Sequence, residues 1–419
     1  MNARVGAILA LLLTLATAAA CGGAGSDDAN TLSVGAVYPL SGSQADGAGE
    51  LAGVQLAADL VNADGGIGGR HVRIVSQDAP SATDAPGAVD TLVDQGVRVI
   101  LGTYGSTQSL AATQRASDRG VTYLETGAVA DAITGRGLPG VLRTVATGST
   151  LGRNAARFAH DFVIPHLGMT PAAARIVVMY EFDQYGSSVG YGSIDEASRL
   201  GLNIVDTIKY DPAHTDFTQL AAQVDADHPD MILTASYLDD AVAFRRAAIA
   251  RHLQVKSIIG TSSAYCRVDF GDILGPDAVG LFASDKPDET LNPSGLTPDA
   301  QALLRRASEA YRQSHPGQEM EAEVLAGFVG AWAMLHDILP HASSLSQADI
   351  WKAAMAVDLP SGSQINGAGI KFSSSGAADA GQNLRAPGVI WEWVGVRHRA
   401  VVSPPAYAQT APQLLPIVQ

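Results

Sequence analysis

Cysteine is scarce in this chain, which has only Cys21 and Cys266 among 419 residues. Cys21 lies directly behind an N-terminal apolar run, so a single cysteine remains for the folded part. An internal disulfide and a metal site built from cysteines are therefore excluded. The ten histidines are scattered, and they show neither H-E-x-x-H spacing nor a paired-carboxylate pattern. We expect no metal and no cofactor.

Basic residues are also in deficit. The chain has 27 lysines and arginines against 42 acidic residues, giving a net charge of -15. This balance disfavours a nucleic-acid partner and binding to an anionic membrane surface, because both carry negative charge. Beyond the N-terminus, no apolar run is expected to cross a membrane. The composition points to a small-molecule partner.

The N-terminus has the features of an export signal. A short basic start is followed by the apolar run Val5 to Ala20, which is shorter than the ~20 residues that span a bilayer. Ala18-Ala19-Ala20-Cys21 resembles the bacterial lipobox, although the usual leucine three residues before the cysteine is Ala18 here. We predict a lipoprotein signal peptide over 1–20, lipidation of Cys21, and a flexible tether over 21–30. The alternative is plain secretion with a coincidental cysteine.

After the tether, apolar strand-like runs alternate with helical patterns. The first series includes "TLSVGAVYPLSG", "ELAGVQLAADLVNADGG", "HVRIVSQDA", "VRVILGTYGS", "TQSLAATQRASDRG" and "VTYLET". A second series starts at "ARIVVMYEF", continues with a helix from about Ser187, and runs through "VKSIIGTSS". Strands this apolar, regularly interrupted by helices, are typical of parallel sheets covered on both faces. Two series predict two doubly wound α/β lobes.

The C-terminal third completes this pattern. "EMEAEVLAGFVGAWAMLHDIL" predicts a long helix with a buried face, "DIWKAAMAV" a shorter helix, and "APGVIWEWVGV" a strand. The tail over 403–419 is rich in proline, alanine and glutamine and is predicted to be irregular.

These segments together resemble the type I periplasmic solute-binding proteins of the branched-chain amino acid group, the receptors of ABC importers. The resemblance covers about residues 31–402. Its motifs are "VGAVYPLSGSQADGAGELAGVQLAADLVNADGGIGGRHVRIVSQDA", "VILGTYGSTQS", "AVADAIT", "DQYG", "TDFTQLAAQV" and "INGAGIKFSSSGAADAG".

The resemblance implies two lobes that are joined by a hinge of three crossings and close on a ligand. It implies lobe 1 over 31–145 plus 284–384 and lobe 2 over 146–283 plus 385–402. It further implies an extracytoplasmic, monomeric receptor that delivers a small solute to an ABC permease. Lipid on Cys21 would hold this receptor at the bacterial cell membrane.

In open parallel α/β sheets, ligands bind beyond the carboxyl ends of the strands. The loop 102–108 lies at such an end, where backbone N–H groups that start the next helix can hold a carboxylate. Ser106 and Thr107 would add hydroxyl donors. Simple N-capping by these two residues is an equally good interpretation.

Several positions depart from the family pattern. Gly105 replaces a serine that contacts the ligand carboxylate, Val129 replaces a threonine, Glu125 replaces a serine, and Ser262 lies near the place of an acid that holds the ligand ammonium. Backbone donors survive these changes, so the expected ligand contacts include Gly105, Gly127, Ala128 and Val129. Glu125 could accept a hydrogen bond from the ligand or cap a local turn. The side-chain grip on an α-amino acid is weakened.

Tyrosines replace much of that grip. Five of them follow the carboxyl ends of predicted strands: Tyr38, Tyr104, Tyr185, Tyr237 and Tyr265. A tyrosine offers a broad apolar face and one hydroxyl. We therefore expect a ligand with an apolar or aromatic body, with a branched-chain amino acid or amide as the alternative. Each tyrosine could instead pack its own loop.

An enzymatic interpretation rests on residues 186–190, which fit the G-x-S-x-G pattern of α/β-hydrolases. The nucleophile in that pattern follows a strand directly, whereas Phe182 to Tyr185 intervene here. The histidines downstream lack supporting context. We therefore expect no enzyme activity. A ligand sensor for a membrane signalling partner stays open beside the importer.

Overall fold

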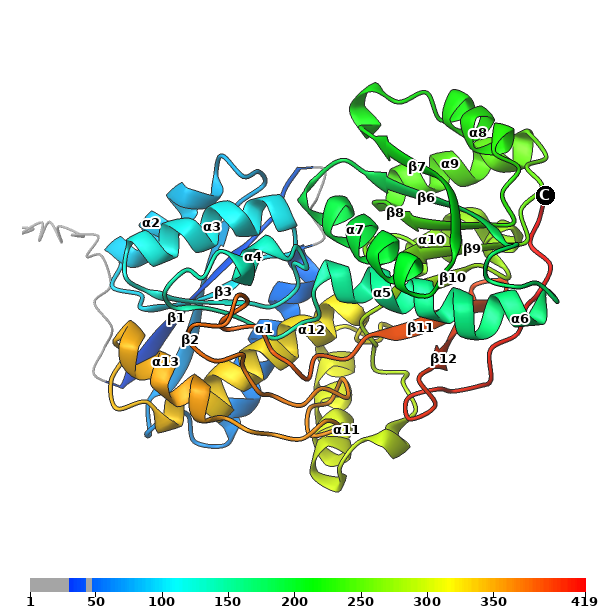
Figure 1. Cartoon of the computed structure of the whole chain (residues 1–419). Helices are drawn as coiled ribbons and strands as arrows, with labels where there is room; N and C mark the ends of the chain where they lie inside the picture. The colour runs from blue at the N-terminus through cyan, green and yellow to red at the C-terminus, as the bar shows by residue number, and fades with distance from the viewer. Residues whose placement is uncertain (1–29, 43–46) are drawn as a thin grey trace, which may run out of the picture.

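The computed structural model of the protein describes residues 30–42 and 47–419. The predicted signal peptide, Cys21 and all but the last residue of the predicted tether lie outside the described residues. Within the described part, the strands form one sheet of five and one of seven, which lie in two lobes side by side (Figure 1).

The sheet of lobe 1 is entirely parallel, in the order β2-β1-β3-β4-β5. Its strands are β1 (Thr31–Tyr38), β2 (His71–Asp78), β3 (Val99–Gly102), β4 (Thr122–Glu125) and β5 (Val141–Arg143). Its helices are α1 (Gly47–Ala63), α2 (Ala85–Asp94), α3 (Ser106–Asp118), α4 (Ala132–Gly135), α11 (Pro298–Ser314), α12 (Ala322–Trp332) and α13 (Gln347–Ala356).

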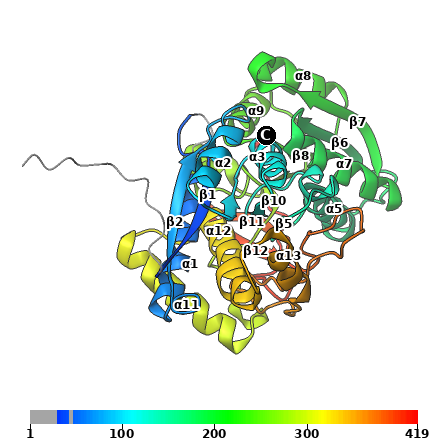
Figure 2. The same ribbon diagram turned by 90° about the vertical axis from the view of Figure 1, so that its left-hand side faces the viewer.

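Alternation along β1 explains why helices cover both faces of this sheet. Val34 and Ala36 pack in the same cluster as α1 and α12, whereas Val37 packs with α2 and α3. Successive side chains of a strand point to opposite faces, so a continuously apolar strand needs cover on both sides. Figure 2 shows the two sets of helices from the side.

The sheet of lobe 2 has the order β12-β11-β10-β9-β8-β6-β7. Strands β6 to β10 run parallel, and β11 and β12 add an antiparallel hairpin at one edge. The strands are β6 (Arg175–Glu181), β7 (Asn203–Tyr210), β8 (Met231–Ala235), β9 (Ser257–Thr261), β10 (Phe282–Asp285), β11 (Val389–Gly395) and β12 (His398–Ser403). The helices are α5 (Gly148–Phe158), α6 (Ile164–His166), α7 (Gln184–Arg199), α8 (Phe217–Ala226), α9 (Leu238–Ala250) and α10 (Val268–Leu274).

The chain passes between the two lobes three times: between β5 and α5, after β10, and before β11. The predicted fold of two doubly wound lobes with a three-crossing hinge is confirmed. Strand β10 belongs wholly to the sheet of lobe 2, so the second crossing begins after Asp285.

Two glycines allow α1 and α12 to pack backbone against backbone. A Cβ atom on Gly53 would lie 2.0 Å from the carbonyl oxygen of Val324, and one on Gly327 would lie 2.0 Å from that of Glu50. Real Cβ atoms do not approach so closely, so the spacing of these helices requires glycine at both positions.

The predicted long helix begins at Ala322 and changes to π-helical and 3₁₀ turns after Trp332. The segment Ala322–His341 is long and apolar enough to cross a membrane, in contrast to the expectation from the sequence. However, 83% of its apolar window is buried inside the protein. Its hydrophobicity is therefore explained by its place in the core of lobe 1.

Residues 404–419 contain no helix or strand, yet they pack closely on the rest of the protein: Tyr407 contacts Gly367, and the last residue contacts Val255 of lobe 2. Tyr407 and Ile417 are buried in the main core cluster. The Gln419 side chain accepts from the Val255 amide at 3.1 Å and donates to the Val255 carbonyl at 2.8 Å. The tail is irregular in conformation but fixed by these contacts.

Candidate functional site

The N-terminus of α3 is one wall of the candidate ligand cleft. Gly105 is the N-cap residue, with extended backbone angles and no side-chain cap. A Cβ atom on it would lie 2.2 Å from Gln108 Oε1, so the Gln108 side chain folds back over the space that a serine would occupy. Thr107 is exposed. An uncapped helix start offers backbone N–H groups to an anion.

Ser106 has a structural partner as well. Its Oγ accepts from the Ala130 amide at 3.1 Å, which joins the start of α3 to the loop after β4. The sequence suggested ligand contact or N-capping for Ser106. In the structure, its hydroxyl instead bridges the two loops of lobe 1.

Glu125, at the end of β4, is fully buried and makes contacts inside lobe 1. Its Oε1 accepts from the amides of Gly127 at 2.9 Å and Ala128 at 2.8 Å. Its Oε2 accepts from the Thr103 amide at 2.8 Å and from the Ser109 hydroxyl. Burial raises the pKa of Glu125 to about 7, although these hydrogen bonds oppose the rise. The carboxylate thus occupies two backbone donors that the sequence had assigned to the ligand.

Tyr38 also points inward. It is fully buried, and its hydroxyl lies 2.7 Å from Thr126 Oγ1, which in turn donates to Glu50 Oε2 at 2.8 Å. A Cβ atom on Gly127 would lie 1.5 Å from Glu50 Oε1, so only glycine fits beside this carboxyl group.

Tyr185 and Tyr237 lie together in lobe 2, on the side that meets lobe 1. Their ring centroids lie 5.1 Å apart. The Tyr185 hydroxyl lies 3.0 Å from Thr261 Oγ1 and donates to the Ser262 carbonyl, and the Tyr237 hydroxyl donates to Asp183 Oδ2 at 3.2 Å. Both tyrosines pack in one apolar cluster with Val129 of lobe 1.

The lobes meet directly around this cluster. The Asp131 amide of lobe 1 donates to Ser188 Oγ of lobe 2 at 3.1 Å, and the Ser149 amide donates to Asp131 Oδ1 at 3.0 Å. Tyr104 is close enough to Tyr185 and Tyr237 to contribute, after burial and other neighbours, to the raised pKa of both. Tyr104, Val129, Tyr185 and Ser262 are all buried.

Tyr265 does not belong to this group. Its ring centroid lies 4.7 Å from that of Phe270, and its carbonyl accepts from Trp393 Nε1 at 2.7 Å. It also touches Gly260, so it packs inside lobe 2. Tyr265 follows the end of β9 at the same edge of the sheet as the candidate site, but its side chain turns into the core.

Ser188, the serine of the G-x-S-x-G pattern, lies in the first turns of α7. That helix begins at Gln184, earlier than the sequence suggested, because Asp183 caps it by accepting from the Gly186 amide at 2.6 Å. The Ser188 hydroxyl donates to the Gln184 carbonyl at 2.9 Å. A nucleophile elbow is therefore absent at this serine.

Sequence reasoning missed Asp285. This residue ends β10, and the register that pairs Ser284 with Thr261 places it beside Ser262. It is 1% exposed; Cys266 Sγ donates to its Oδ2 at 2.6 Å, and Oδ1 has no hydrogen-bond partner within the described part of the chain. The end of β9 has Ser262 where the family has an acid, and Asp285 supplies an acidic group on the neighbouring strand. An acidic residue ending an apolar strand, "LFASD", was the available signal.

Several acidic side chains, among them Glu181 and Asp183, lie close to Tyr237. Burial, then the charges of Asp183, Asp240 and Asp211, raises the pKa of Glu181 to about 8. Burial likewise raises the pKa of Asp240 to about 6. Within the described ranges, no cluster of histidine, cysteine and acidic residues could hold a metal ion.

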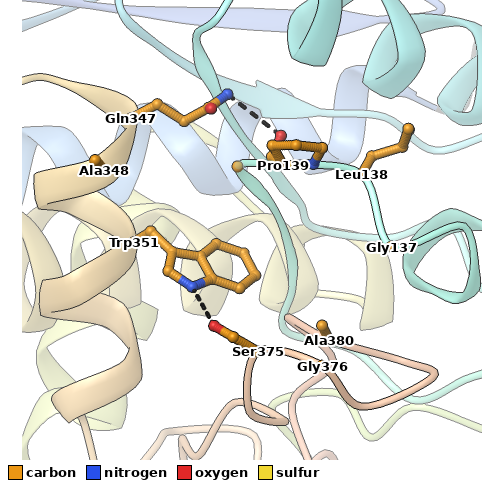
Figure 3. Close-up of a pocket in the computed structure, with 10 residues that line it drawn as sticks. Gly137, Leu138, Pro139, Gln347, Ala348, Trp351, Ser375, Gly376 and Ala380 are labelled. Carbon is orange, nitrogen blue, oxygen red and sulfur yellow. Dashed lines mark hydrogen bonds between the residues drawn. The ribbon is translucent and has the colours of Figure 1, made fainter.

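A cavity of about 390 Å³ lies elsewhere on lobe 1, between α13 and the turn before β5 (Figure 3). Trp351 Nε1 donates to Ser375 Oγ at 3.0 Å, and Gln347 Nε2 donates to the Pro139 carbonyl at 3.2 Å. None of its lining residues comes from lobe 2. This cavity is separate from the candidate cleft.

Comparison with known proteins identifies the family of most of the chain. The family described as periplasmic binding protein matches residues 31–385. A Leu/Ile/Val-binding protein homolog 8 from Brucella abortus (strain 2308) is 33% identical over 362 residues, covering 86% of this chain and 87% of that relative.

Solved structures show the same fold at low identity. A leucine binding protein from Thermotoga maritima has a TM-score of 0.74 and 21% identity, covering 89% of this chain and 98% of that one. A solute binding protein from R. palustris in complex with benzoate has a TM-score of 0.72 and 18% identity, covering 93% and 99%. Members of this family are substrate receptors and not enzymes, and the family implies an extracytoplasmic place and an ABC transporter as partner. The chain belongs to the periplasmic binding protein family.

Proposed function

We propose that this receptor captures a small carboxylate with an apolar or aromatic body and delivers it to its ABC permease. The observation that carries the proposal is the start of α3, where the N-cap residue Gly105 makes no side-chain cap and Tyr104 directly precedes the helix. The helix N-terminus holds the carboxylate through backbone N–H groups without a cationic side chain. Ligand binding closes the lobes as a hinge, and no covalent bond is made or broken.

The tyrosines define the space for the ligand body. Tyr237 is half-buried, and Tyr104 and Tyr185 are buried between the lobes; opening of the lobes would expose their rings to a ligand. Aromatic rings stack well on such surfaces at an offset or tilted angle. The benzoate complex of a structural relative supports a binding site of this kind in the same fold.

A receptor for an amino acid is the second candidate, and Asp285 favours it. Asp285 is buried beside the charge of Lys286, yet its Oδ1 has no hydrogen-bond partner among the described residues and its Oδ2 accepts from a thiol, which is a weak donor. The ammonium group of an amino acid could pair with it. The Leu/Ile/Val-binding relatives support this alternative.

A ligand panel separates the two candidates. We expect benzoate to bind at least tenfold tighter than L-leucine in isothermal titration calorimetry, because benzoate has an aromatic body to stack on the tyrosines and no ammonium group that needs a partner. L-Phenylalanine, which carries both groups, shows whether an aromatic amino acid binds as well. Tyr104→Ala and Tyr237→Ala should each weaken the binding of benzoate by more than tenfold, about 1.4 kcal/mol. Tyr191→Ala, on the exposed part of α7, is the matched control and should change nothing. Tight leucine binding without binding of either aromatic probe would establish the amino-acid alternative.

We further propose that Cys21 carries a lipid and that the mature receptor is a monomer at the cell membrane. In cells supplied with radiolabelled palmitate, the wild type and Cys266→Ala should be labelled, while Cys21→Ser should not. The control distinguishes the two cysteines, because Cys266 is buried within lobe 2. An unlabelled wild-type protein found wholly in the soluble fraction would show plain secretion instead.

The neighbouring genes distinguish an importer from a sensor. Permease and ATPase genes next to this one support import, whereas a gene for a membrane kinase would support signalling.

A further inference from the structure

Three segments of lobe 1 converge on the single carboxylate of Glu125. They are the turn after β3, through the Thr103 amide; α3, through the Ser109 hydroxyl; and the turn after β4, through the Gly127 and Ala128 amides. Thr103 Oγ1 adds a longer contact of 3.3 Å to the same oxygen, Oε2. The two turns are those that form the lobe 1 wall of the candidate cleft.

Gly127 is held from its other side as well. Lys286, which follows β10 at the second crossing, donates from Nζ to the Gly127 carbonyl at 3.2 Å. Lys286 is 6% exposed, so this contact is shielded from water. The N–H of Gly127 therefore points to Glu125 while its carbonyl points to the hinge, and this fixes the plane of both peptide bonds around it.

A neutral amide cannot replace this carboxylate. Both oxygens of Glu125 accept from backbone N–H groups, Oε1 from the turn after β4 and Oε2 from the turn after β3. A glutamine has one oxygen and one NH₂ group, so in either orientation its NH₂ group faces an N–H donor. One turn must then lose its acceptor and shift.

We infer that Glu125 is a positioning residue for the ligand: it sets the two turns of lobe 1 and leaves the start of α3 as the donor group for the ligand carboxylate. Glu125 itself does not contact the ligand. The expected effect on ligand affinity depends on the carboxylate ligand proposed above. The expected effect on the two turns does not depend on it.

The test uses the soluble mature chain and two variants, Glu125→Gln and Glu125→Asp. Glu392→Gln is the matched control, because Glu392 is a buried carboxyl group of lobe 2 that accepts from one backbone amide, that of Gln413, at 2.7 Å. Hydrogen exchange of the ligand-free proteins reports on the turns. Calorimetry with benzoate and with L-phenylalanine reports on affinity.

In Glu125→Gln we expect the amides of Thr103 or of Gly127 and Ala128 to exchange at least tenfold faster, while the strands of lobe 2 are unchanged. The probe that the wild type binds should bind at least tenfold more weakly. Glu125→Asp keeps the charge but is one methylene shorter, so it should show the same faster exchange and serves if the glutamine variant does not fold. Glu392→Gln should retain the wild-type affinity.

Unchanged exchange in both turns overturns the inference, even if neither probe binds the wild type. Faster exchange with unchanged affinity also overturns it, because the turns would then not matter to the ligand. Failure of both probes to bind the wild type, with faster exchange in the variants, counts against the proposed ligand class and supports the positioning of the turns.

Discussion

The Gly327→Val variant is expected to lose at least about 3 kcal/mol of unfolding free energy, enough to prevent lobe 1 from folding in the native arrangement. A Cβ atom at this position would lie 2.0 Å from the carbonyl oxygen of Glu50 and 2.7 Å from its carbonyl carbon. These are backbone atoms in the first turn of α1, so they cannot turn aside as a flexible side chain could. Helices α1 and α12 would have to separate.

Gly87 provides the matched control, since it lies within α2 and a Cβ atom on it would meet nothing within 4 Å. Gly87→Ala should leave the protein as stable as the wild type or more stable by about 0.5–1 kcal/mol, because alanine favours helix. Thermal unfolding followed by circular dichroism measures both variants. A Gly327→Val protein with the wild-type melting temperature would show that the two helices do not require their close contact.

We expect the protein to be more stable at about pH 5 than at about pH 8, by a few kcal/mol in sum. Burial raises the pKa of Glu125 to about 7, Glu181 to about 8, Asp240 to about 6 and Glu392 to about 7. The folded state therefore binds protons more tightly than the unfolded state does. This contribution to stability is fully present below the unfolded pKa values, near 4. It is lost as the pH rises through each folded value.

Groups with lowered pKa act in a different range. Arginine partners lower the pKa of Asp64, Asp90 and Glu196. Their contribution is present above the unfolded values and is lost only as the pH falls through the lower folded values. It therefore leaves the trend between about pH 5 and pH 8 unchanged.

Melting temperatures across this range test the prediction, and Glu392→Gln serves as its internal check. Glu392 Oε2 accepts from the Gln413 amide, and Oε1 is buried without a hydrogen-bond partner among the described residues. A glutamine can keep the first contact and cannot ionise, so the variant should lose less stability than the wild type as the pH rises. A wild-type melting temperature that increases from about pH 5 to pH 8 would contradict the assignment.

The course of the chain was predictable because its strands and helices differ clearly in pattern. Strand β8, "MILTA", is buried along its whole length, and the turns between elements carry glycine or aspartate. The start of α7 was placed too late because the side chain of Asp183, and not a serine in the helix, caps it. The close contact of α1 and α12 was not predicted, since a glycine in a helix shows the same pattern whether it faces a helix or water.

The residues that follow the ends of strands were predictable, but the direction of their side chains was not. Position at the end of a strand places Tyr185 and Tyr265 at the same edge of the sheet, yet one faces the cleft cluster and the other the core. Glu125 follows the same rule and turns inward, because three backbone donors lie within its reach. Asp285 was not predicted, because the family resemblance pointed to Ser262 after β9. The pairing of β9 with β10, which brings Asp285 beside Ser262, is not visible in the sequence.

The hairpin of β11 and β12 has a consequence for the order in which the chain can fold. Strand β11 pairs with β10 across more than a hundred intervening residues, and the last residue of the chain pairs with Val255. Lobe 1 likewise needs α12, which packs with α1 over the same face of its sheet. Neither lobe can be completed from an N-terminal fragment. Lobe 1 therefore lacks part of its cover until α12 has been made, and the sheet of lobe 2 lacks its antiparallel edge until β11 and β12 have been made.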